Sequence, residues 1–233
     1  MALTLKTIDL GGVNCYLGCE EGQYVLFDTG GYLVLDKTFD NRRELLGKAL
    51  KENGCNKDNL KLLVLTHGDI DHVANAMYLK KQYGLQIAMH KGDVNLVQNP
   101  KLEDMMASFN YRGMIYKLVM KCMKSKIESV MKKTLDAFEQ FTPDILLNEG
   151  DSLKQYGFDA KILHLPGHTE GSIGILTGDN ELIVGDLFQN NKKLDKAINA
   201  INFKKLDESV QRVEAMNVKA FYVGHGVPWK QIG

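Results

Sequence analysis

The stretch Thr66-His67-Gly68-Asp69-Ile70-Asp71-His72 carries four side chains of the kind that bind metals, and it directly follows the apolar run Leu62 to Leu65. The apolar and β-branched residues of 61–66 predict a buried strand, and apolar spacing from there onward predicts a helix over 72–83. A strand that ends in a loop rich in histidine and aspartate indicates a metal site.

The spacing within this loop favours two neighbouring cations over one. In a turn that leaves the strand, His67 and Asp69 can point the same way, while Asp71 and His72 reach a second position a few ångströms further on. The other interpretation is a polar turn that only caps the following helix, because aspartate is favoured at that position.

Three more strand-like runs end in a single ligand-type residue that has glycine before it. His168 follows the run Ile162 to Leu165, Asp186 follows Leu182 to Val184, and His225 follows Phe221 to Val223. A helix cap explains none of these three, so the pattern favours the metal site.

The order of these residues resembles the metallo-β-lactamase superfamily, within its group of glyoxalase-II-like hydrolases. That family has an HxHxDH motif, a lone histidine, a bridging aspartate and a final histidine. The resemblance places these roles on seven residues: His67, Asp69, Asp71, His72, His168, Asp186 and His225. Asp28-Thr29-Gly30 also resembles the family's early Asp-Thr-Gly turn, which lies under the metal site.

The resemblance implies an α/β fold, the four-layer αββα sandwich. The pattern of the chain agrees, because it predicts strands near 3–9, 13–19, 24–28, 62–66, 86–89, 152–156, 160–165, 173–177, 181–185 and 220–223, with helices near 37–53, 72–83 and 206–217. A chain of 233 residues with 44% hydrophobic residues can bury one sizeable core. We therefore expect a single domain over residues 1–233.

Residues 91–141 do not have the pattern of the sandwich, and we expect them to form a helical insertion. From Arg112 to Lys133, apolar residues recur at helical spacing and lysines occupy the other faces. The segment is interpreted as a helix packed on the sandwich, a lid or wall over the metal cleft, a helix on a membrane surface, or a dimer contact. Its lysines also make an anionic substrate one option.

The family's arrangement implies two divalent metal ions with Asp186 between them. The first would be held by His67, Asp69 and His168, and the second by Asp71, His72 and His225. A hydroxide that bridges the metals would attack an ester, thioester, lactone or similar bond of a small-molecule substrate. Asp71 would also orient this nucleophile, which makes it the expected catalytic residue.

Asp69 departs from the family pattern, which has a second histidine there. A carboxylate there shifts the preference from zinc towards iron or manganese, although zinc also binds carboxylates. It resembles the glutamate of flavodiiron proteins. The main alternative function is therefore a non-haem di-iron oxidoreductase, followed by a phosphodiesterase and a non-catalytic metal-stabilised binding protein.

Glyoxalase II has a C-terminal helical extension for its glutathione thioester, whereas eight residues follow His225 here.

The net charge and the N-terminal segment indicate which partners and which cellular location to expect for the protein. The 29 basic and 29 acidic residues create no overall field that attracts nucleic acid, so we expect no nucleic-acid partner. The segment Met1 to Lys6 lacks a charged leader before an apolar stretch, and no run approaches the roughly 18 apolar residues of a transmembrane helix. We expect a cytoplasmic protein, either a monomer or a homo-oligomer.

Two further histidines are expected not to bind metal. His90 follows a strand and is expected near the surface, whereas His164 is expected to support the site from behind the ligands. The four cysteines lack paired spacing, so neither a disulfide framework nor a structural zinc site is indicated.

Overall fold

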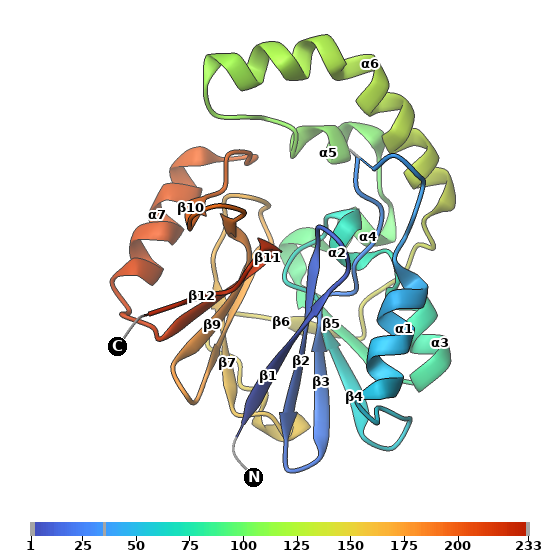
Figure 1. Ribbon diagram of the computed structural model, residues 1–233, viewed down its shortest axis with the longest axis vertical. Coiled ribbons are helices and arrows are strands. Elements are labelled where there is room, and N and C mark those ends of the chain that lie inside the picture. The colour runs from blue at the N-terminus through green and yellow to red at the C-terminus, as the bar shows by residue number, and fades with distance from the viewer. Residues whose placement is uncertain (1–2, 35, 232–233) are drawn as a thin grey trace.

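The computed structural model describes residues 3–34 and 36–231, so the outermost residues of the expected domain lie outside the description. Two sheets form its centre (Figure 1). The first has the order β1 (Thr4–Asp9), β2 (Asn14–Glu20), β3 (Gln23–Phe27), β4 (Leu60–Val64), β5 (Gln86–His90), β6 (Ile145–Leu147). The antiparallel pairs β1·β2 and β2·β3 are followed by the parallel pairs β3·β4, β4·β5 and β5·β6.

The second sheet comes from the C-terminal part of the chain. Its order is β12 (Trp229–Lys230), β11 (Ala220–Gly226), β9 (Glu181–Asn190), β8 (Ile173–Thr177), β7 (Ala160–His164), with β10 (Asp195–Lys196) paired to β9. Only the pair of β11 and β9 is parallel among these ladders.

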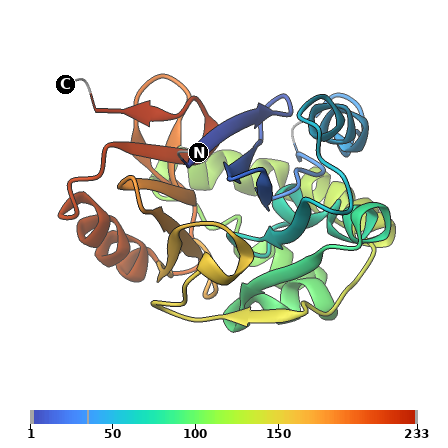
Figure 2. The same ribbon diagram turned by 90° about the horizontal axis from the view of Figure 1, so that it is seen from below.

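Helices lie outside both sheets. They are α1 (Arg43–Glu52), α2 (Ile70–Val73), α3 (Ala76–Tyr83), α4 (Val94–Gln98), α5 (Leu102–Ala107), α6 (Met114–Ala137) and α7 (Phe203–Glu214), with 3-10 turns η1 (Lys91–Asp93) and η2 (Lys154–Tyr156). Figure 2 shows α7 outside the second sheet and α1 on the opposite side of the molecule. None of the described helices is both long and apolar enough to cross a membrane.

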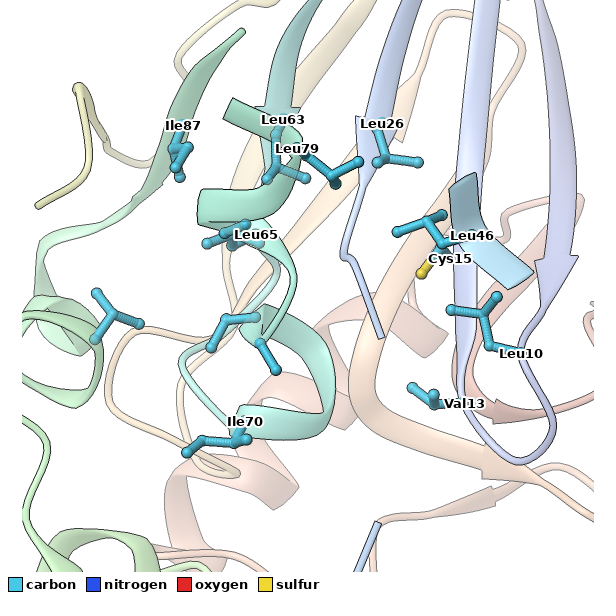
Figure 3. Packing of buried hydrophobic residues seen from close by; sticks show 14 of the residues in the cluster. Leu10, Val13, Cys15, Leu26, Leu46, Leu63, Leu65, Ile70, Leu79 and Ile87 are labelled. Carbon is cyan, nitrogen blue, oxygen red and sulfur yellow. The ribbon is translucent and has the colours of Figure 1, made fainter. Parts of the chain in front are cut away.

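The alternation of β4 shows how these layers are held together. Leu62 and Val64 belong to the cluster between the sheets, which also contains Ile175 and Ile183 of the second sheet. Leu63 points the other way and packs against the helices, as Figure 3 shows beside Leu79. Because successive side chains of a strand face opposite sides, an almost wholly apolar strand is buried on both. A third cluster packs α7 on the second sheet.

These clusters give the αββα sandwich that the sequence predicts. The expected strand over 152–156 is wrong: between Gly150 and Gly157, both with positive φ, the chain forms η2 and a single bridge from Ser152 to Lys161. The helix expected from residue 37 begins at Arg43. The preceding loop is fixed by Arg42, which is buried and donates two hydrogen bonds to Asp36.

The short strands β6, β10 and β12 were not predicted, since two or three residues carry too little periodicity. Strand β6 matters for the architecture because it pairs with β5, although residues 91–141 separate them. This intervening segment forms η1, α4, α5 and α6 and covers one end of the sandwich (Figure 1).

Candidate metal centre

The seven residues singled out in the sequence meet at one end of the two sheets. His67 to His72 occupy the turn from β4 into α2, and His168 lies in the loop from β7 to β8. Asp186 and His225 lie within β9 and β11, not after these strands as expected. The pairing of β9 with β11 shifts register here, and such irregularities re-aim side chains.

Glycine leaves room for this arrangement. Gly185 has a φ of 50°, a left-handed conformation that other residues rarely adopt. A Cβ atom on Gly224 would collide with Oδ1 of Asp186 and lie 2.7 Å from Cε1 of His72. Gly224 therefore allows the side chains of Asp186 and His72 to approach one another, and Gly185 allows β9 to pass close to Thr66.

Two groups of donor atoms can be distinguished. In the first group, Asp69 Oδ2 lies 3.1 Å from His168 Nε2 and 3.9 Å from His67 Nε2. In the second, Asp71 Oδ2 lies 3.3 Å from His225 Nε2 and 3.9 Å from His72 Nε2. Two donors about 2.0 Å from a tetrahedral metal are about 3.3 Å apart, so both groups have suitable dimensions.

Asp186 lies between the groups. Its Oδ1 is 3.3 Å from His72 Nε2, and its Oδ2 is 3.2 Å from His225 Nε2 and 3.7 Å from His168 Nε2. A single carboxylate therefore faces histidines of both groups, as a bridging ligand must.

Hydrogen bonds behind the centre determine which nitrogen each histidine presents. Nδ1 of His72 donates a hydrogen bond at 2.9 Å to Oδ2 of Asp28, which is buried. Nδ1 of His67 lies 3.0 Å from Oγ1 of Thr66, whose own hydroxyl donates to Asp28. Both Nδ1 atoms therefore carry the proton, and both Nε2 atoms present a lone pair to the centre.

The other two histidines are anchored by backbone carbonyls. Nδ1 of His168 donates to the carbonyl of Asn199 at 3.2 Å, and Nδ1 of His225 donates to that of Gly12 at 2.6 Å. All four imidazoles thus direct Nε2 inward, where the neutral form of each can bind a metal.

Buried atoms at the centre lack a partner. His67 Nε2, His72 Nε2 and Asp186 Oδ1 have no hydrogen-bond partner among the residues that the structure describes. Leaving a buried acceptor unpaired costs about 1–3 kcal/mol each. Buried imidazole nitrogens and a carboxylate oxygen that converge without a hydrogen-bond partner fit a site for divalent cations.

Protons and cations compete for these atoms. Burial lowers the pKa of His168, but the hydrogen bond to Asp69 and the charges of Asp69 and Asp186 more than offset this and raise it to about 9. Burial raises the pKa of Asp186, but the adjacent His225 and His72 hold it well below its usual range. Metal binding here therefore releases protons.

The sequence did not single out Asp93, which joins the two ligand loops. Its buried carboxylate accepts hydrogen bonds from Gly68 N at 2.8 Å and from Thr169 Oγ1 and Gly171 N at 2.6 Å each. Burial raises its pKa to about 6 despite these bonds. The signal was present, because Asp93 stands beside glycine after a strand, as His168 does.

Tyr111 and Asn199 were also missed, and no sequence pattern marks them. They form an isolated backbone bridge that connects the insertion to the loop behind His168. Tyr111 lines the cavity next to the centre. Burial and then Asp71 and Asp69 raise the pKa of this phenol, so it keeps its proton at neutral pH.

The structure corrects the expectations for His90 and His164. His90 is buried, not near the surface. His164 stacks on it with ring centroids 4.0 Å apart, and its Nε2 donates to the carbonyl of Glu170. His164 therefore supports the loop that contains Glu170. Among the described residues, none of its hydrogen bonds goes to one of the seven ligand residues.

A cavity of about 370 Å³ opens beside the centre. Asp69, Asp71, Asp186 and His225 line it, and α5 and α6 contribute apolar side chains to the remaining wall. The lid or wall interpretation of the insertion fits this position. The C-terminal half of α6 is also packed on the helix-side core, through Ile127 and Met131.

Comparisons with known proteins agree with this geometry. The chain is 36% identical over 135 residues to hydroxyacylglutathione hydrolase GloC of Haemophilus influenzae, a match that covers 56% of this chain and 51% of that protein. The match thus spans about half of the relative's length. A hydroxyacylglutathione hydrolase of Pelagibacter ubique is 23% identical over 218 residues, covering 86% and 67%.

Solved structures show the same fold. A metallo-beta-lactamase family protein of Thermus thermophilus superposes with a TM-score of 0.70 at 20% identity, covering 98% of this chain and 74% of that one. BLEG-1 B3 metallo-beta-lactamase gives a TM-score of 0.69 at 20% identity, covering 97% and 94%. The family profile "Metallo-beta-lactamase superfamily" matches residues 8–225. The chain therefore belongs to the metallo-beta-lactamase superfamily.

Proposed function

We propose that this protein is a hydrolase that depends on two divalent metal ions and cleaves an ester, thioester, lactone or similar bond in a small molecule. The observation that carries the proposal is the convergence of four imidazole Nε2 atoms and three carboxylates beside a cavity. The relatives named hydroxyacylglutathione hydrolase support the reaction class, since that name describes the cleavage of a thioester.

His67, Asp69 and His168 would hold one ion, Asp71, His72 and His225 the other, and Asp186 both. Bound metals supply a Lewis acid and lower the pKa of water towards about 7. Zinc is one candidate, and the carboxylate of Asp69 makes iron or manganese the other.

The protein's own residues have distinct tasks in this proposal. His67 and His72 are 1% and 0% exposed and hold the centre from below, whereas Asp71 and His225 are 22% and 23% exposed and face the cavity. Asp71 would orient the attacking water and accept its proton. The protonated phenol of Tyr111 would donate a hydrogen bond to the substrate's carbonyl oxygen.

The proposal also includes a single domain in which residues 91–141 form a wall that controls access to the metal centre. Asp69 also favours the second candidate, a di-iron oxidoreductase, because a carboxylate occupies a position that a histidine usually holds. The hydrolase is favoured by the relatives' names.

One set of measurements separates the two candidates. Protein purified without a nickel column is analysed for metals, then tested on a panel of esters, thioesters and lactones and for oxygen consumption with a reductant. We expect about two metal ions per chain and turnover on the panel. Oxygen consumption without hydrolysis would favour the oxidoreductase, and a chain that binds no metal would refute both.

A further inference from the structure

The wall of the cavity differs sharply from its end at the metal centre. Away from the carboxylates, the cavity runs beneath α5 and α6, where its lining includes Met105, Phe109, Met120, Met123, Ile127 and Met131. Four of these six residues are methionines, whose flexible and polarisable side chains adapt to apolar ligands of varied shape. This part of the cavity is therefore suited to a hydrocarbon group.

The charge of the cavity lining narrows the choice of ligand further. Among the residues that the structure describes, no lysine or arginine lines it. The lysines of α6, such as Lys117, Lys121 and Lys124, are exposed on its other faces. An anionic substrate, one option from the sequence, would find none of these lysines among the described lining residues. A charged glutathione moiety would likewise find no cationic partner among the described lining residues.

The apolar wall continues into the packed interior. Ile127 and Met131 are 2% and 4% exposed and belong to the helix-side core, and Met120 and Met123 pack on the same cluster. In contrast, Met114 at the start of the same helix is 89% exposed. The methionines at the cavity thus have fixed surroundings, and a volume of about 370 Å³ falls within the range of small-ligand sites.

We propose that this cavity is a binding site for an unbranched acyl chain. The chain would lie beneath α6 among the methionines, with its carbonyl group at the carboxylate end beside Asp71. Resting on the proposed hydrolase function, this identifies the substrate class as an acyl ester, thioester or lactone. Hydrolysis adds one water molecule. The water oxygen bonds to the acyl carbon, and the bond from that carbon to the oxygen of the alcohol, or to the sulfur of the thiol, breaks. The leaving oxygen or sulfur takes a proton.

Binding is tested without the reaction. Uncharged n-alkanols from butanol to dodecanol compete with the fluorescent apolar probe N-phenyl-1-naphthylamine for the purified protein. Each methylene that is buried should tighten binding about fourfold until the cavity is full. Equal affinity for butanol and octanol would overturn the proposal.

Substitutions at one helix supply the matched control. Met123→Gln should weaken octanol binding at least tenfold, whereas Met114→Gln, the same change on the exposed turn, should leave it unchanged. Met123→Leu should retain binding, and Tm is measured for all three. If Met123→Gln unfolds, Met120→Gln replaces it. Equal effects at positions 114 and 123 would contradict the assigned site.

Hydrolysis is measured separately, with p-nitrophenyl esters from acetyl to dodecanoyl and with a hydroxyacylglutathione thioester. We expect kcat/KM to rise with chain length and to be low for the glutathione thioester. A kcat/KM that does not change with chain length would refute the acyl site but not the proposed hydrolase function. Chain-length-dependent binding without turnover of any ester, thioester or lactone would support the acyl site and refute the hydrolase.

Discussion

Replacing Asp28 by asparagine tests whether the residue behind the metal centre selects the form of His72. Asp28 has a φ of 59°, a conformation that asparagine also adopts, so the change adds little backbone strain. Its Oδ1 accepts a hydrogen bond from Thr66 N at 2.7 Å, while Oδ2 accepts from Thr66 Oγ1 at 2.8 Å and from His72 Nδ1 at 2.9 Å.

Asparagine offers one acceptor oxygen where aspartate offers two. With that oxygen on Thr66 N, the new NH₂ group meets Nδ1 of His72, where a donor would face a donor. His72 must then move its proton to Nε2 and lose the lone pair that faces Asp71 and Asp186. Loss of such an outer partner weakens metal binding about 10- to 100-fold. That factor corresponds to about 1.4–2.7 kcal/mol.

The assay is a titration of the metal-loaded protein with a chelator, followed by the metal content of each sample. We expect Asp28→Asn to release metal at about 10- to 100-fold lower chelator activity, with the group of Asp71, His72 and His225 emptied first. Asp179→Asn, an exposed position in the turn between β8 and β9, is the control. Titration curves within twofold of each other for Asp28→Asn and the wild type would refute the tautomer argument.

Three further predictions concern the ligands and the fold. Asp186→Ala should abolish hydrolysis and reduce metal content, whereas His90→Ala should do neither; near-normal turnover of the Asp186 variant would show that the bridge is misassigned. Asp69→His should increase the affinity for zinc relative to manganese, and an unchanged ratio in anaerobic competition binding would remove Asp69 from metal choice. Burial raises the pKa of Asp144, but hydrogen bonds from Lys80 and Ile87 outweigh this and lower it, so its contribution to stability is present above about pH 4 and lost as pH falls through the lowered pKa. Asp144→Asn should therefore lower the free energy of unfolding by about 1 kcal/mol at pH 7, with less effect near pH 2 in urea titrations.

Strand ends were the most predictable part of the site, because runs of apolar residues followed by glycine and a ligand-type residue are visible in the sequence. His168, Asp186 and His225 have this signature, although Asp186 and His225 lie within their strands, and the loop from His67 to His72 follows the apolar run Leu62 to Leu65. The αββα arrangement followed in the same way, since β4 is apolar on both faces and must be covered twice.

Contacts between distant segments could not be predicted. Asn199 anchors His168 through its backbone carbonyl, and any residue type offers that carbonyl. Tyr111 reaches the cavity because the insertion folds back, not because of its neighbours in sequence. His90 was expected near the surface, but its burial depends on stacking with His164 from the other sheet. Tertiary packing decides such positions.

The pairing of β5 with β6 has a consequence for how the chain can be altered. The chain leaves the sheet after His90 and returns to pair His90 with Leu147, so the register does not depend on what lies between them. The backbone closes this excursion again where Phe141 N donates to Val97 O. Closure entropy grows slowly with loop length. Residues 98–140 also give Ile127 and Met131 to the core and Tyr111 to the bridge with Asn199. A graft that keeps these contacts and Asp93 would alter which molecules enter while the ligand loops stay in place.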